Sequence, residues 1–518
     1  MSLLEIKDLG FKYDGASEPA LRGVSLTVSP GEVILLCGPT GSGKTTFLRS
    51  LLKNEDLRAE RVGTVEFFGS RIGYVGQSSG VFATDRVRYE LAFAAENTNF
   101  PPNVTRRRVA EIASALGLGA FYDRRVSSLS GGERRLVSLG AAMAASPELL
   151  LLDEPTASLD PVTAARFYDT LLRLARENGT ALIISEHKTE LLCDRADRMA
   201  VLKRGELVAL DKPERLARLL DDGEIRGFLP VSARALAPFP SETALPLTVS
   251  KGRELLAEQL GARRPRIVGA ERKFGEMALE LKNIDFSYGK AERPILGELS
   301  LTLGAGEALC LLGANGSGKS TLLSVAAGFL RASSGKVKIF GKRIEEYRGN
   351  SLYDGTLAYL PQDISSVFVN ETVKEEIGGA EPPFDISGIR DRDPRELSGG
   401  EARLAALAVA LAKKPRILLL DEPLRGLDPR SKEMIAGVLR ELRDRGTAIL
   451  AVTHDPDTAP LFADRCALLF GGEICAEGET RKFLSEGEFF TTAAKKLAKG
   501  FIDGAVTEGD IREALRGK

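Results

Sequence analysis

The chain has 518 residues, which is long for one ordinary domain and suits two or three. Its 71 Lys and Arg residues balance 72 Asp and Glu residues, so the formal net charge is −1. This balance argues against a protein that coats DNA or RNA by neutralising phosphates, and the absence of Trp weakens the case for base stacking. With 43% hydrophobic and 28% charged residues, the composition is that of a soluble globular protein.

Membrane spans and secretion signals are not predicted. One of the longest apolar runs, Leu404–Ala412, is far shorter than the roughly 18–20 residues that cross a bilayer. The first residues, MSLLEIKDLGFKYDG, lack a basic segment followed by an apolar one, so we expect no cleaved signal peptide. The cysteines form no CxxC pair, and Cys37 and Cys310 lie in apolar strand-like runs. Buried free thiols in a reducing, cytosolic compartment are therefore predicted, without a cysteine-based metal site.

The first motif in chain order is GPTGSGKTT, which follows the apolar run VILLC and precedes FLRSLL. Gly-x4-Gly-Lys-Thr between a strand and a helix is typical of a phosphate-binding loop. Glycines are needed because backbone N–H groups close around the phosphates, which a Cβ would obstruct. Lys44 is predicted to reach the β- and γ-phosphates, and Thr45 to hold Mg²⁺ through its hydroxyl. The candidate nucleotide-binding residues here are Gly38, Gly41, Gly43, Lys44, Thr45 and Thr46.

Two short strand-like runs follow, VGTVEFFG and RIGYVGQ, and the second ends at Gln77. The side-chain amide of Gln77 is a candidate to sense Mg²⁺ and the attacking water, with a surface glutamine as the alternative. A helical region then leads to LSGGERR, where Ser130, Gly131 and Gly132 precede a long amphipathic run. Exposed glycines with a serine at the N-terminus of a helix form an anion site.

The run LLLLDEP predicts a fully buried parallel strand that ends at Asp153. A carboxylate there is a candidate Mg²⁺ ligand, and Glu154 directly after it is a candidate general base or water-orienting group. Further along the chain, His187 ends the strand-like run ALIISEH. A contact with the γ-phosphate and the attacking water is predicted for this histidine, with a solvated or core histidine as the alternative.

A proline-containing segment follows, in which PERLARLLDD and SKGRELLAEQL read as helical patches separated by turn signals. We expect a packed linker rather than a free tether. The motifs then return in the same order as GANGSGKST, LAYLPQ, LSGGEAR, ILLLDEP and AILAVTH. The interval from Lys44 to Lys319 is nearly the same as the interval from His187 to His454. Nearly constant offsets over a repeat of this length indicate a duplicated domain.

The second copy repeats every candidate residue of the first. Its nucleotide-binding candidates are Gly313, Gly316, Gly318, Lys319, Ser320 and Thr321. Its Mg²⁺ candidates are Ser320, Gln362 and Asp421, as Thr45, Gln77 and Asp153 are in the first copy. Glu422, His454 and Gln362 are its catalytic candidates, and Ser398, Gly399 and Gly400 form its second anion site.

The copies differ in two places. The stretch from the loop lysine to the glutamine is shorter in the first copy, whereas the stretch from the glutamine to the LSGGE serine is shorter in the second. The first copy is therefore trimmed in its strand-forming region, and the second in its helical region. The interval from that serine to the aspartate of DEP is identical in the two copies, so the chemical core keeps its length. In the tail, a last helix is predicted to begin at Thr507.

Together, the phosphate loop, glutamine loop, LSGGE, LLLLDEP, a following Asp loop and a switch histidine, each present twice, resemble a tandem ATP-binding cassette (ABC) ATPase. The resemblance covers nearly the whole chain apart from linker and tail. It implies an α/β fold with two P-loop NTPase cassettes, each with a mostly parallel sheet core, an antiparallel β subdomain and a helical subdomain. The implied boundaries are 1–215 and 277–485 for the cassettes, 216–276 for the linker and 486–518 for a helical tail.

In that family two cassettes pair head to tail, and each ATP lies between the phosphate loop of one and the LSGGE signature of the other. The resemblance implies this pairing within the chain, with ATP and Mg²⁺ as cofactors. Lys44 and Glu154 would act with Ser398–Gly400, and Lys319 and Glu422 with Ser130–Gly132.

Further residues enter the nucleotide-binding set only through this resemblance. Tyr13 in FKYDG and Tyr288 in FSYGK match the aromatic residue that stacks on adenine, with a core or turn tyrosine as the alternative. Asp160 and Asp428 are the aspartates of the two Asp loops.

Three classes of tandem-cassette protein are candidates. Ribosome-associated translation factors typically carry NHLD after DEPT and SHD at the switch, whereas this chain has PTASLD and PLRGLD, with SEHKTE and THDPDT. Fused sugar-importer ATPases usually carry altered signatures and one degenerate phosphate loop, whereas both sets are intact here. The third kind is the fused ATPase of an energy-coupling-factor (ECF) transporter. SSGVFATDRVRYELAFAAEN, ISEHKTELLCDRADRMAVLKRGELVALDKP and FFTTAAKKLAKG resemble that group.

The ECF resemblance implies an ATPase that powers uptake of a vitamin or metal ion through separate integral membrane subunits. The protein is expected to be cytoplasmic and to bind peripherally to the inner face of the cell membrane. Helices of the membrane partner are expected to dock near Gln77 and Gln362. No nucleic-acid partner is expected, in keeping with the charge balance. The translation factor and the sugar-importer ATPase remain the alternatives.

Overall fold

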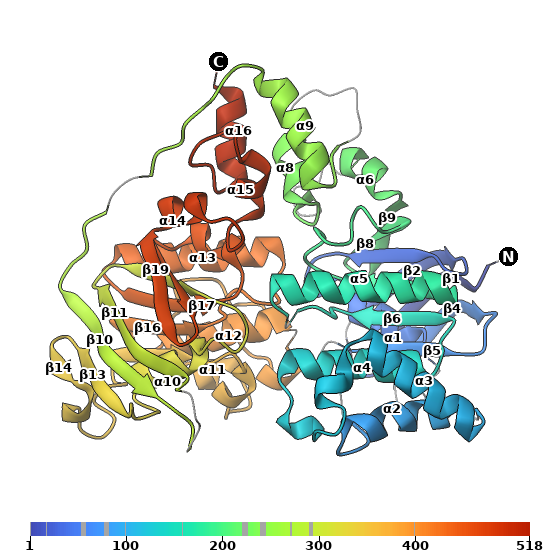
Figure 1. Ribbon diagram of the computed structural model, residues 1–518, viewed down its shortest axis with the longest axis horizontal. Coiled ribbons are helices and arrows are strands. Elements are labelled where there is room, and N and C mark those ends of the chain that lie inside the picture. The colour runs from blue at the N-terminus through green and yellow to red at the C-terminus, as the bar shows by residue number, and fades with distance from the viewer. Residues whose placement is uncertain are drawn as a thin grey trace. The chain divides into compact units, whose positions relative to one another are not determined.

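The structure, a computed structural model, describes residues 2–16, 18–52, 59–76, 82–98, 100–157, 159–219, 226–238, 245–269, 272–289, 294–397 and 399–517. The chain folds into two compact units, Met1–Thr248 and Val249–Lys518, which we call the N-terminal unit and the C-terminal unit (Figure 1). The division falls inside the predicted linker.

The described residues of the N-terminal unit form two sheets. The smaller is antiparallel, in the order β2-β1-β4. The larger has the order β5-β6-β7-β3-β8-β9 and is parallel apart from the β8–β9 pair. The strands are β1 (Leu4–Tyr13), β2 (Leu21–Val28), β3 (Val33–Cys37), β4 (Ala59–Phe67), β5 (Ile72–Val75), β6 (Leu149–Asp153), β7 (Ala181–Ser185), β8 (Arg198–Lys203) and β9 (Glu206–Asp211). Strands β3, β6 and β7 are buried along their whole length, as the apolar runs predict.

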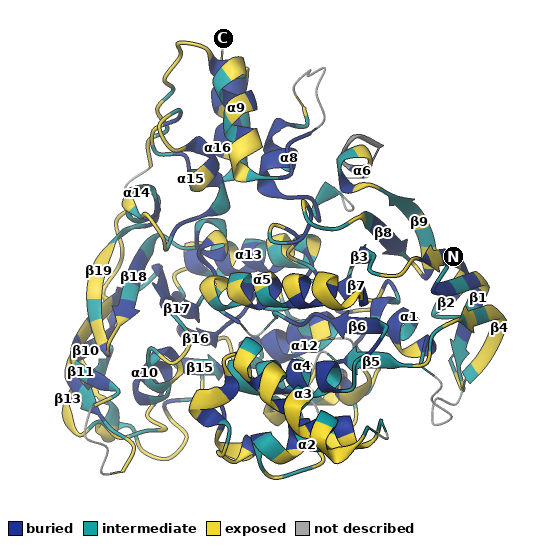
Figure 2. Ribbon diagram, turned by 45° about the vertical axis from the view of Figure 1, so that its right-hand side comes forward, coloured by how far each residue is buried: buried dark blue, intermediate teal, exposed yellow. Residues whose placement is uncertain are grey.

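The helices of the N-terminal unit lie between its strands and after them. They are α1 (Lys44–Ser50), α2 (Val87–Glu96), α3 (Pro102–Ala115), α4 (Gly131–Ala144), α5 (Pro161–Asn178), α6 (Pro213–Leu219) and α8 (Val231–Leu236), with 3₁₀ turns at Leu118–Phe121 and Val126–Ser128. Helix α5 begins after the cap Asp160 with a proline in its first turn and ends at Gly179, which has φ 67°. Figure 2 shows α5 with one buried and one exposed face, the pattern of a helix that covers a sheet.

The C-terminal unit repeats this plan. Its antiparallel sheet has the order β11-β10-β13-β14, and its larger sheet the order β15-β16-β17-β12-β18-β19, parallel apart from β18–β19. The strands are β10 (Met277–Phe286), β11 (Leu296–Gly304), β12 (Ala308–Leu312), β13 (Ser334–Ile339), β14 (Lys342–Arg343), β15 (Leu357–Leu360), β16 (Ile417–Asp421), β17 (Ala448–Thr453), β18 (Arg465–Phe470) and β19 (Glu473–Glu479).

The helices of the C-terminal unit include the end of the linker and the tail. They are α9 (Val249–Leu260), α10 (Lys319–Ala326), α11 (Val373–Glu376), α12 (Gly399–Leu411), α13 (Pro429–Asp444), α14 (Thr480–Glu486), α15 (Ala493–Ala498) and α16 (Glu508–Arg516), with 3₁₀ turns at Ile344–Glu346, Ile364–Val367, Pro394–Glu396 and Pro456–Leu461. Each unit thus contains a mostly parallel sheet, an antiparallel sheet and a helical part, which confirms the predicted fold class.

The predicted differences between the copies are confirmed. Before the signature the N-terminal unit has α2 and α3, with 10 and 14 residues, whereas the C-terminal unit has only the four-residue α11. Between the phosphate loop and the glutamine, the C-terminal unit adds β14, which pairs with β13, the counterpart of β4. Among the described helices, none is both long enough and apolar enough for a membrane span.

The linker packs rather than hanging free, as the sequence predicts. Phe228, just before α8, and Ala233, within α8, belong to the hydrophobic core of the N-terminal unit. In the C-terminal unit α9 packs against α15, and Arg253 donates hydrogen bonds to the carbonyls of Lys496 and Lys499. Thr507 caps α16 in a capping box with Asp510, at the predicted start of the last helix.

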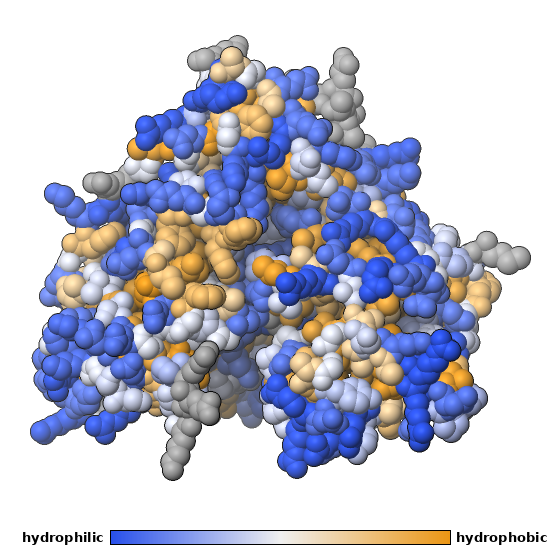
Figure 3. All heavy atoms as spheres, in the orientation of Figure 1, coloured by the Kyte–Doolittle hydropathy of each residue, from blue (hydrophilic) through white to orange (hydrophobic). Residues whose placement is uncertain are grey.

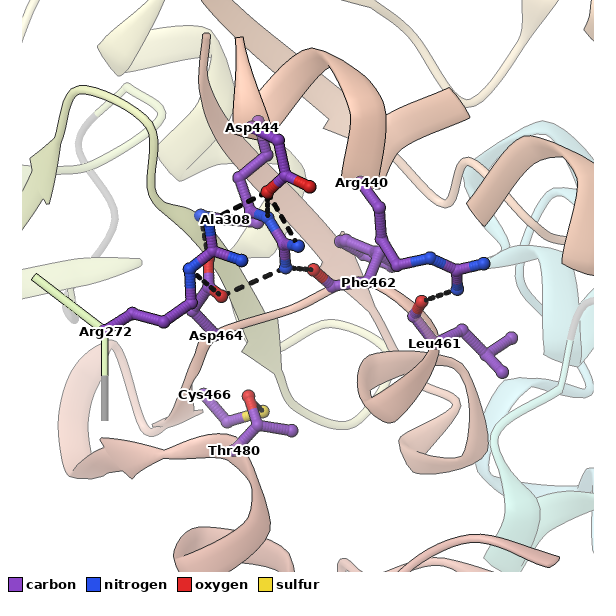
Figure 4. A network of polar contacts seen from close by, with 10 residues as sticks. Arg272, Ala308, Arg440, Asp444, Leu461, Phe462, Asp464, Cys466 and Thr480 are labelled. Carbon is purple, nitrogen blue, oxygen red and sulfur yellow. Dashed lines mark hydrogen bonds and ion pairs between the residues drawn. The ribbon is translucent and has the colours of Figure 1, made fainter. Parts of the chain in front are cut away.

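The segment between α9 and β10 is fastened to the C-terminal unit by a polar network (Figure 4). Arg272 forms ion pairs with Asp444 at 2.8 Å and with Asp464 at 3.6 Å. Asp464 also accepts hydrogen bonds from the Ala308 N–H at 3.0 Å and from Arg443 at 3.0 Å, and the Arg443 and Asp464 side chains are about nine-tenths buried. Burial raises the pKa of Asp464, against the opposing effects of these hydrogen bonds.

Replacing Asp464 by alanine is expected to destabilise the C-terminal unit by about 3 kcal/mol, because the buried Arg443 guanidinium loses its buried carboxylate partner and keeps only the half-exposed Asp444. For a unit of this size the thermal midpoint should fall by about 6–12 °C, which calorimetry measures. The control is Glu177→Ala, which breaks the exposed Arg173–Glu177 pair and should leave the midpoint unchanged. Equal shifts in the two variants would contradict a structural role for the Asp464 network.

Candidate nucleotide-binding sites

The phosphate loop of the N-terminal unit joins the buried strand β3 to helix α1. Gly43 has φ 99° and lies just before α1, a backbone conformation that glycine tolerates best. A Cβ on Gly38 would lie 2.1 Å from the Leu202 carbonyl oxygen, so no larger residue fits there. Lys44 is 6% exposed, and its Nζ donates to the carbonyls of Gly38 at 2.7 Å and Pro39 at 3.0 Å. The loop therefore wraps around a buried ammonium group.

The second phosphate loop has the same geometry. Gly318 has φ 102° before α10, and a Cβ on Gly313 would lie 2.7 Å from the Leu469 carbonyl oxygen. Lys319 is 7% exposed and donates to the carbonyls of Gly313 and Ala314, each at 2.9 Å. A helix N-terminus and a buried cation in each loop create a site for a phosphate chain.

The predicted Mg²⁺ ligand Asp153 ends β6 and is 1% exposed. Ser185 donates to its Oδ1 at 2.6 Å, while its Oδ2 is buried without a hydrogen-bond partner. In the C-terminal unit burial raises the pKa of Asp421, against a hydrogen bond from the Ser320 hydroxyl. A buried carboxylate oxygen without a partner and a hydroxyl bonded to a carboxylate are the donors that a hard cation such as Mg²⁺ uses.

No cluster of three or more His, Cys, Asp or Glu side chains that could hold a metal occurs within the described parts of the chain. Mg²⁺ typically takes one or two protein ligands and completes its shell with phosphate oxygens and water. The residues thus fit the ion when it arrives with a nucleotide.

Glu154 and His187 are brought together by β6 and β7. Glu154 has φ 47°, a strained conformation for a glutamate, and its N–H donates to the Ser185 carbonyl at 3.1 Å. This turns the carboxylate toward the end of β7, where its Oε1 lies 2.8 Å from Nε2 of His187. The histidine ring also packs against Phe228, with 6.0 Å between ring centroids. The predicted base and switch residue are in direct contact.

Glu422 and His454 form the same pair in the C-terminal unit, through a different ring nitrogen. Glu422 has φ 53°, and its Oε1 lies 2.5 Å from Nδ1 of His454 and accepts the His454 backbone N–H at 2.9 Å. Thr453 donates its hydroxyl to Oε2 at 2.9 Å. Burial raises the pKa of Glu422, but the contacts with His454 and Thr453 outweigh it and hold the pKa below its ordinary value.

The LSGGE signatures begin helices α4 and α12. In the N-terminal unit the Ser130 hydroxyl accepts the Glu133 N–H at 3.3 Å, and the Glu133 carboxylate accepts the Ser130 N–H at 2.7 Å. Gly131 is exposed at this helix N-terminus, as predicted for an anion site. Helix α12 starts at Gly399, which is also exposed, whereas Gly132 is partly buried and Gly400 is buried, contrary to the expectation of exposed glycines at both positions. Ser398 lies outside the described residues, as does Gln77 of the glutamine loop.

The remaining predicted residues lie around these loops. Thr45 and Thr46 lie in the first turn of α1, and Ser320 and Thr321 in that of α10. The Tyr13 hydroxyl lies 3.2 Å from Thr46 Oγ1, which brings the tyrosine to the phosphate loop.

Four of the predicted residues are exposed or engaged in other contacts. Tyr288 is 54% exposed and packs edge-on against Phe286. Asp160 caps α5 and Asp428 caps α13, each through hydrogen bonds to the first turn, so both have a structural role in this conformation. Gln362 is exposed, and its backbone carbonyl accepts a hydrogen bond from the Arg403 side chain.

Two arginines beside the sites were not predicted from the motifs. Arg135 in α4 and Arg403 in α12 are buried, although an arginine inside an amphipathic helix usually faces water. Arg135 donates to the Gly76 carbonyl, and Arg403 donates to the Glu422 carbonyl at 2.7 Å. Burial lowers the pKa of Arg403 to about 10. Their presence at the same place in both signatures is the sequence signal that could have revealed them.

Comparisons with known proteins also indicate ATP-binding cassettes. The family described as ABC transporter matches residues 21–157 and 296–425. A protein of Bacillus anthracis named "Putative ABC transporter ATP-binding protein" is 34% identical, over 99% of this chain and 98% of its own length. A protein with that name from Streptomyces avermitilis is 32% identical, over 99% and 100%.

Two further similarities concern proteins with more specific names. The "Putative HMP/thiamine import ATP-binding protein YkoD" of Bacillus subtilis is 28% identical, over 99% of this chain and 98% of its own length. The solved structure of cbiO1 from Clostridium perfringens aligns with 42% of this chain and 90% of its own length, with 26% identity and a TM-score of 0.38. The family match covers both phosphate loops, both signatures and both DEP motifs, and the chain therefore belongs to the ABC transporter family, as an ATPase with two ATP-binding cassettes in one polypeptide.

Proposed function

We propose that this chain is the ATP-hydrolysing subunit of an ECF-type importer, which powers uptake of a vitamin or metal ion through separate integral membrane subunits. The observation that carries the proposal is the direct glutamate–histidine contact beside a complete phosphate loop in each unit. Both copies keep a complete set of motifs, whereas fused sugar-importer ATPases usually carry altered signatures and one degenerate phosphate loop. The ECF-like segments of the sequence and the import function in the name of the Bacillus subtilis relative support the choice of transporter.

Within each unit the proposed division of labour follows from the contacts. Lys44 and Lys319 would hold the β- and γ-phosphates, since each ammonium group already lies inside its loop. Mg²⁺, when bound, would supply charge neutralisation on the phosphates, held through Thr45 and Asp153 or Ser320 and Asp421.

The bases act next to the switch histidines. Glu154 and Glu422 would accept a proton from the attacking water, and His187 and His454 would orient that carboxylate and contact the γ-phosphate. The glutamine-loop roles of Gln77 and Gln362 and the pairing of the two cassettes around ATP remain predictions from the resemblance.

The helical part of each unit offers apolar side chains for a membrane partner. On α2 Tyr89 and Phe93 are 47% and 45% exposed and lie one turn apart, shortly after the glutamine loop. In the C-terminal unit Val369, which follows Gln362 closely in the chain, is 86% exposed. Figure 3 shows apolar and hydrophilic side chains interspersed over the α2–α4 part of the N-terminal unit. We propose that the partner helices dock on these residues.

Replacing Tyr89 and Phe93 by alanine is expected to reduce the membrane protein that co-purifies with the chain at least about 10-fold, because large interface aromatics carry much of the binding energy. ATP binding should stay unchanged. The measurement is affinity purification from detergent-solubilised membranes of the native host, with mass spectrometry. The matched control is Phe68→Ala, which removes another exposed aromatic side chain of the same unit, 60% exposed on the antiparallel-sheet side.

Two outcomes would contradict the proposal. If no integral membrane protein co-purifies with the unaltered chain, the transport function is wrong. ATP-dependent co-sedimentation with ribosomes would instead favour the translation-factor alternative.

A further inference from the structure

A buried glutamate lies beside the switch histidine of the N-terminal unit and has no part in the mechanism above. Glu186 directly precedes His187 and is 4% exposed. Its backbone N–H donates to the Leu36 carbonyl at 3.2 Å, on the strand that leads into the phosphate loop. Carboxylates are rarely buried without partners, because desolvation of the charge is costly.

The Glu186 carboxylate joins two other elements. Its Oε1 accepts hydrogen bonds from the Tyr168 hydroxyl at 2.6 Å, the Thr156 hydroxyl at 2.7 Å and the Thr156 N–H at 3.1 Å. Thr156 lies two residues after Glu154, and Tyr168 is a 1% exposed residue of α5. Glu186 therefore ties the end of β7 to the turn after Glu154 and to helix α5.

The three donors converge on one oxygen, so Oε1 serves only as an acceptor in either protonation state. Burial raises the pKa of Glu186, while the hydrogen bonds from Tyr168 and Thr156 lower it. Burial also raises the pKa of Tyr168, which stays a hydroxyl and a donor. An amide oxygen in place of Oε1 could accept the same three bonds.

The C-terminal unit replaces all three members of this network. The residue before its switch histidine is Thr453, the residue two positions after its base is Leu424, and the counterpart of Tyr168 in the helix that follows the Asp loop is Ala436. Leu424 and Ala436 are buried and apolar. Thr453 donates its hydroxyl directly to the base Glu422. At the position before the switch histidine, the C-terminal unit thus has a donor to the base, Thr453. The N-terminal unit has an acceptor there, Glu186, which is bonded by other elements.

We propose that Glu186 is a positioning residue of the N-terminal site, which holds the segment that carries His187 against the turn that follows Glu154. In the C-terminal unit the corresponding segment is held through the base itself, by Thr453. The two ATP sites of this chain are therefore built differently, because the position before the switch histidine is a buried acid in the N-terminal unit and a threonine in the C-terminal unit. This inference rests on the proposed roles of Glu154 and His187.

The test is vanadate trapping of photoreactive 8-azido-ATP in the full chain, with the labelled peptides of each unit counted separately. Glu186→Thr, which installs the residue of the other unit, should lower trapping in the N-terminal unit about 10-fold or more, because small misplacements of catalytic groups are costly. Trapping in the C-terminal unit should stay within about twofold. Photolabelling without hydrolysis should show unchanged ATP binding in both units.

Two further variants separate positioning from damage to the fold. Glu186→Gln keeps the acceptor oxygen and should restore trapping to near the unaltered level. Tyr168→Phe keeps the buried ring, removes one of the three bonds and should cause a smaller loss in the N-terminal unit alone. The proposal is overturned if Glu186→Thr traps normally, if both units lose trapping alike, or if Glu186→Gln is as damaging as Glu186→Thr. Absence of trapping in the unaltered chain would instead overturn the proposed ATPase roles themselves.

Discussion

Replacing Glu154 and Glu422 together by glutamine is expected to reduce ATP turnover at least about 10³-fold, while ATP binding persists. General-base catalysis contributes about 10²–10⁴-fold, and a glutamine cannot take the proton of the attacking water. The amide has the shape of the carboxylate, so the contacts that shape the phosphate loops stay in place. Phosphate release measures turnover, and equilibrium binding of ATP measures occupancy of the sites.

The geometry makes this prediction sharper than the motif alone does. Both glutamates have a positive φ, at 47° and 53°, and both carboxylates meet the ring of the switch histidine. This conformation is costly for a glutamate, and strained residues of this kind cluster at active sites. The control variants Glu177→Gln and Glu441→Gln change exposed helix residues and should leave turnover unaltered. Retained turnover in the double glutamine variant would mean that the bases lie elsewhere.

The central strands and the ends of several helices could be predicted because short-range rules decide them. LLLLD and ILLLD are continuous apolar runs, and both form fully buried strands that end in an aspartate. The last helix begins after Thr507 because its hydroxyl and Asp510 satisfy the first N–H groups. Cys37 and Cys310 are buried free thiols, as expected for residues inside such strands.

The contacts around the bases could not be predicted, because they join residues far apart in the chain. Glu186 and Thr156 lie on different elements, and no spacing rule connects a residue of the turn after DEP with the residue before the switch histidine. The motif also does not specify which ring nitrogen of the histidine faces the glutamate, and the two units differ in this. Packing of the neighbouring strands and helices decides both.

The tyrosines and aspartates assigned through the family resemblance also divide into roles that local chemistry predicts and roles that it does not. Tyr13 reaches Thr46 of the phosphate loop, whereas Tyr288 is more than half exposed. Asp160 and Asp428 use their carboxylates to cap the following helices. A nucleotide contact for these residues remains a prediction, whereas the capping role follows from ordinary helix chemistry.

Replacing Lys44 and Lys319 by alanine is expected to weaken ATP binding at least about 100-fold at each site, which corresponds to about 2.7 kcal/mol. Each ammonium group is more than nine-tenths buried and lies 2.7–3.0 Å from carbonyl oxygens of its own loop. Charge-assisted hydrogen bonds to phosphate are among the strongest in proteins, and alanine supplies none. Equilibrium binding of a fluorescent ATP analogue to each single variant and to the double variant measures the loss.

Arginine should not replace lysine here, because the loop encloses a compact ammonium group and a planar guanidinium is larger. The matched controls are Lys7→Ala and Lys282→Ala, which remove exposed lysines from the first strand of each unit and should leave ATP affinity unchanged. Each single variant should keep one tight site, since each loop belongs to its own unit. If both lysines can be removed without weakening ATP binding, the phosphates are held by other groups, and the assignment of both loops fails.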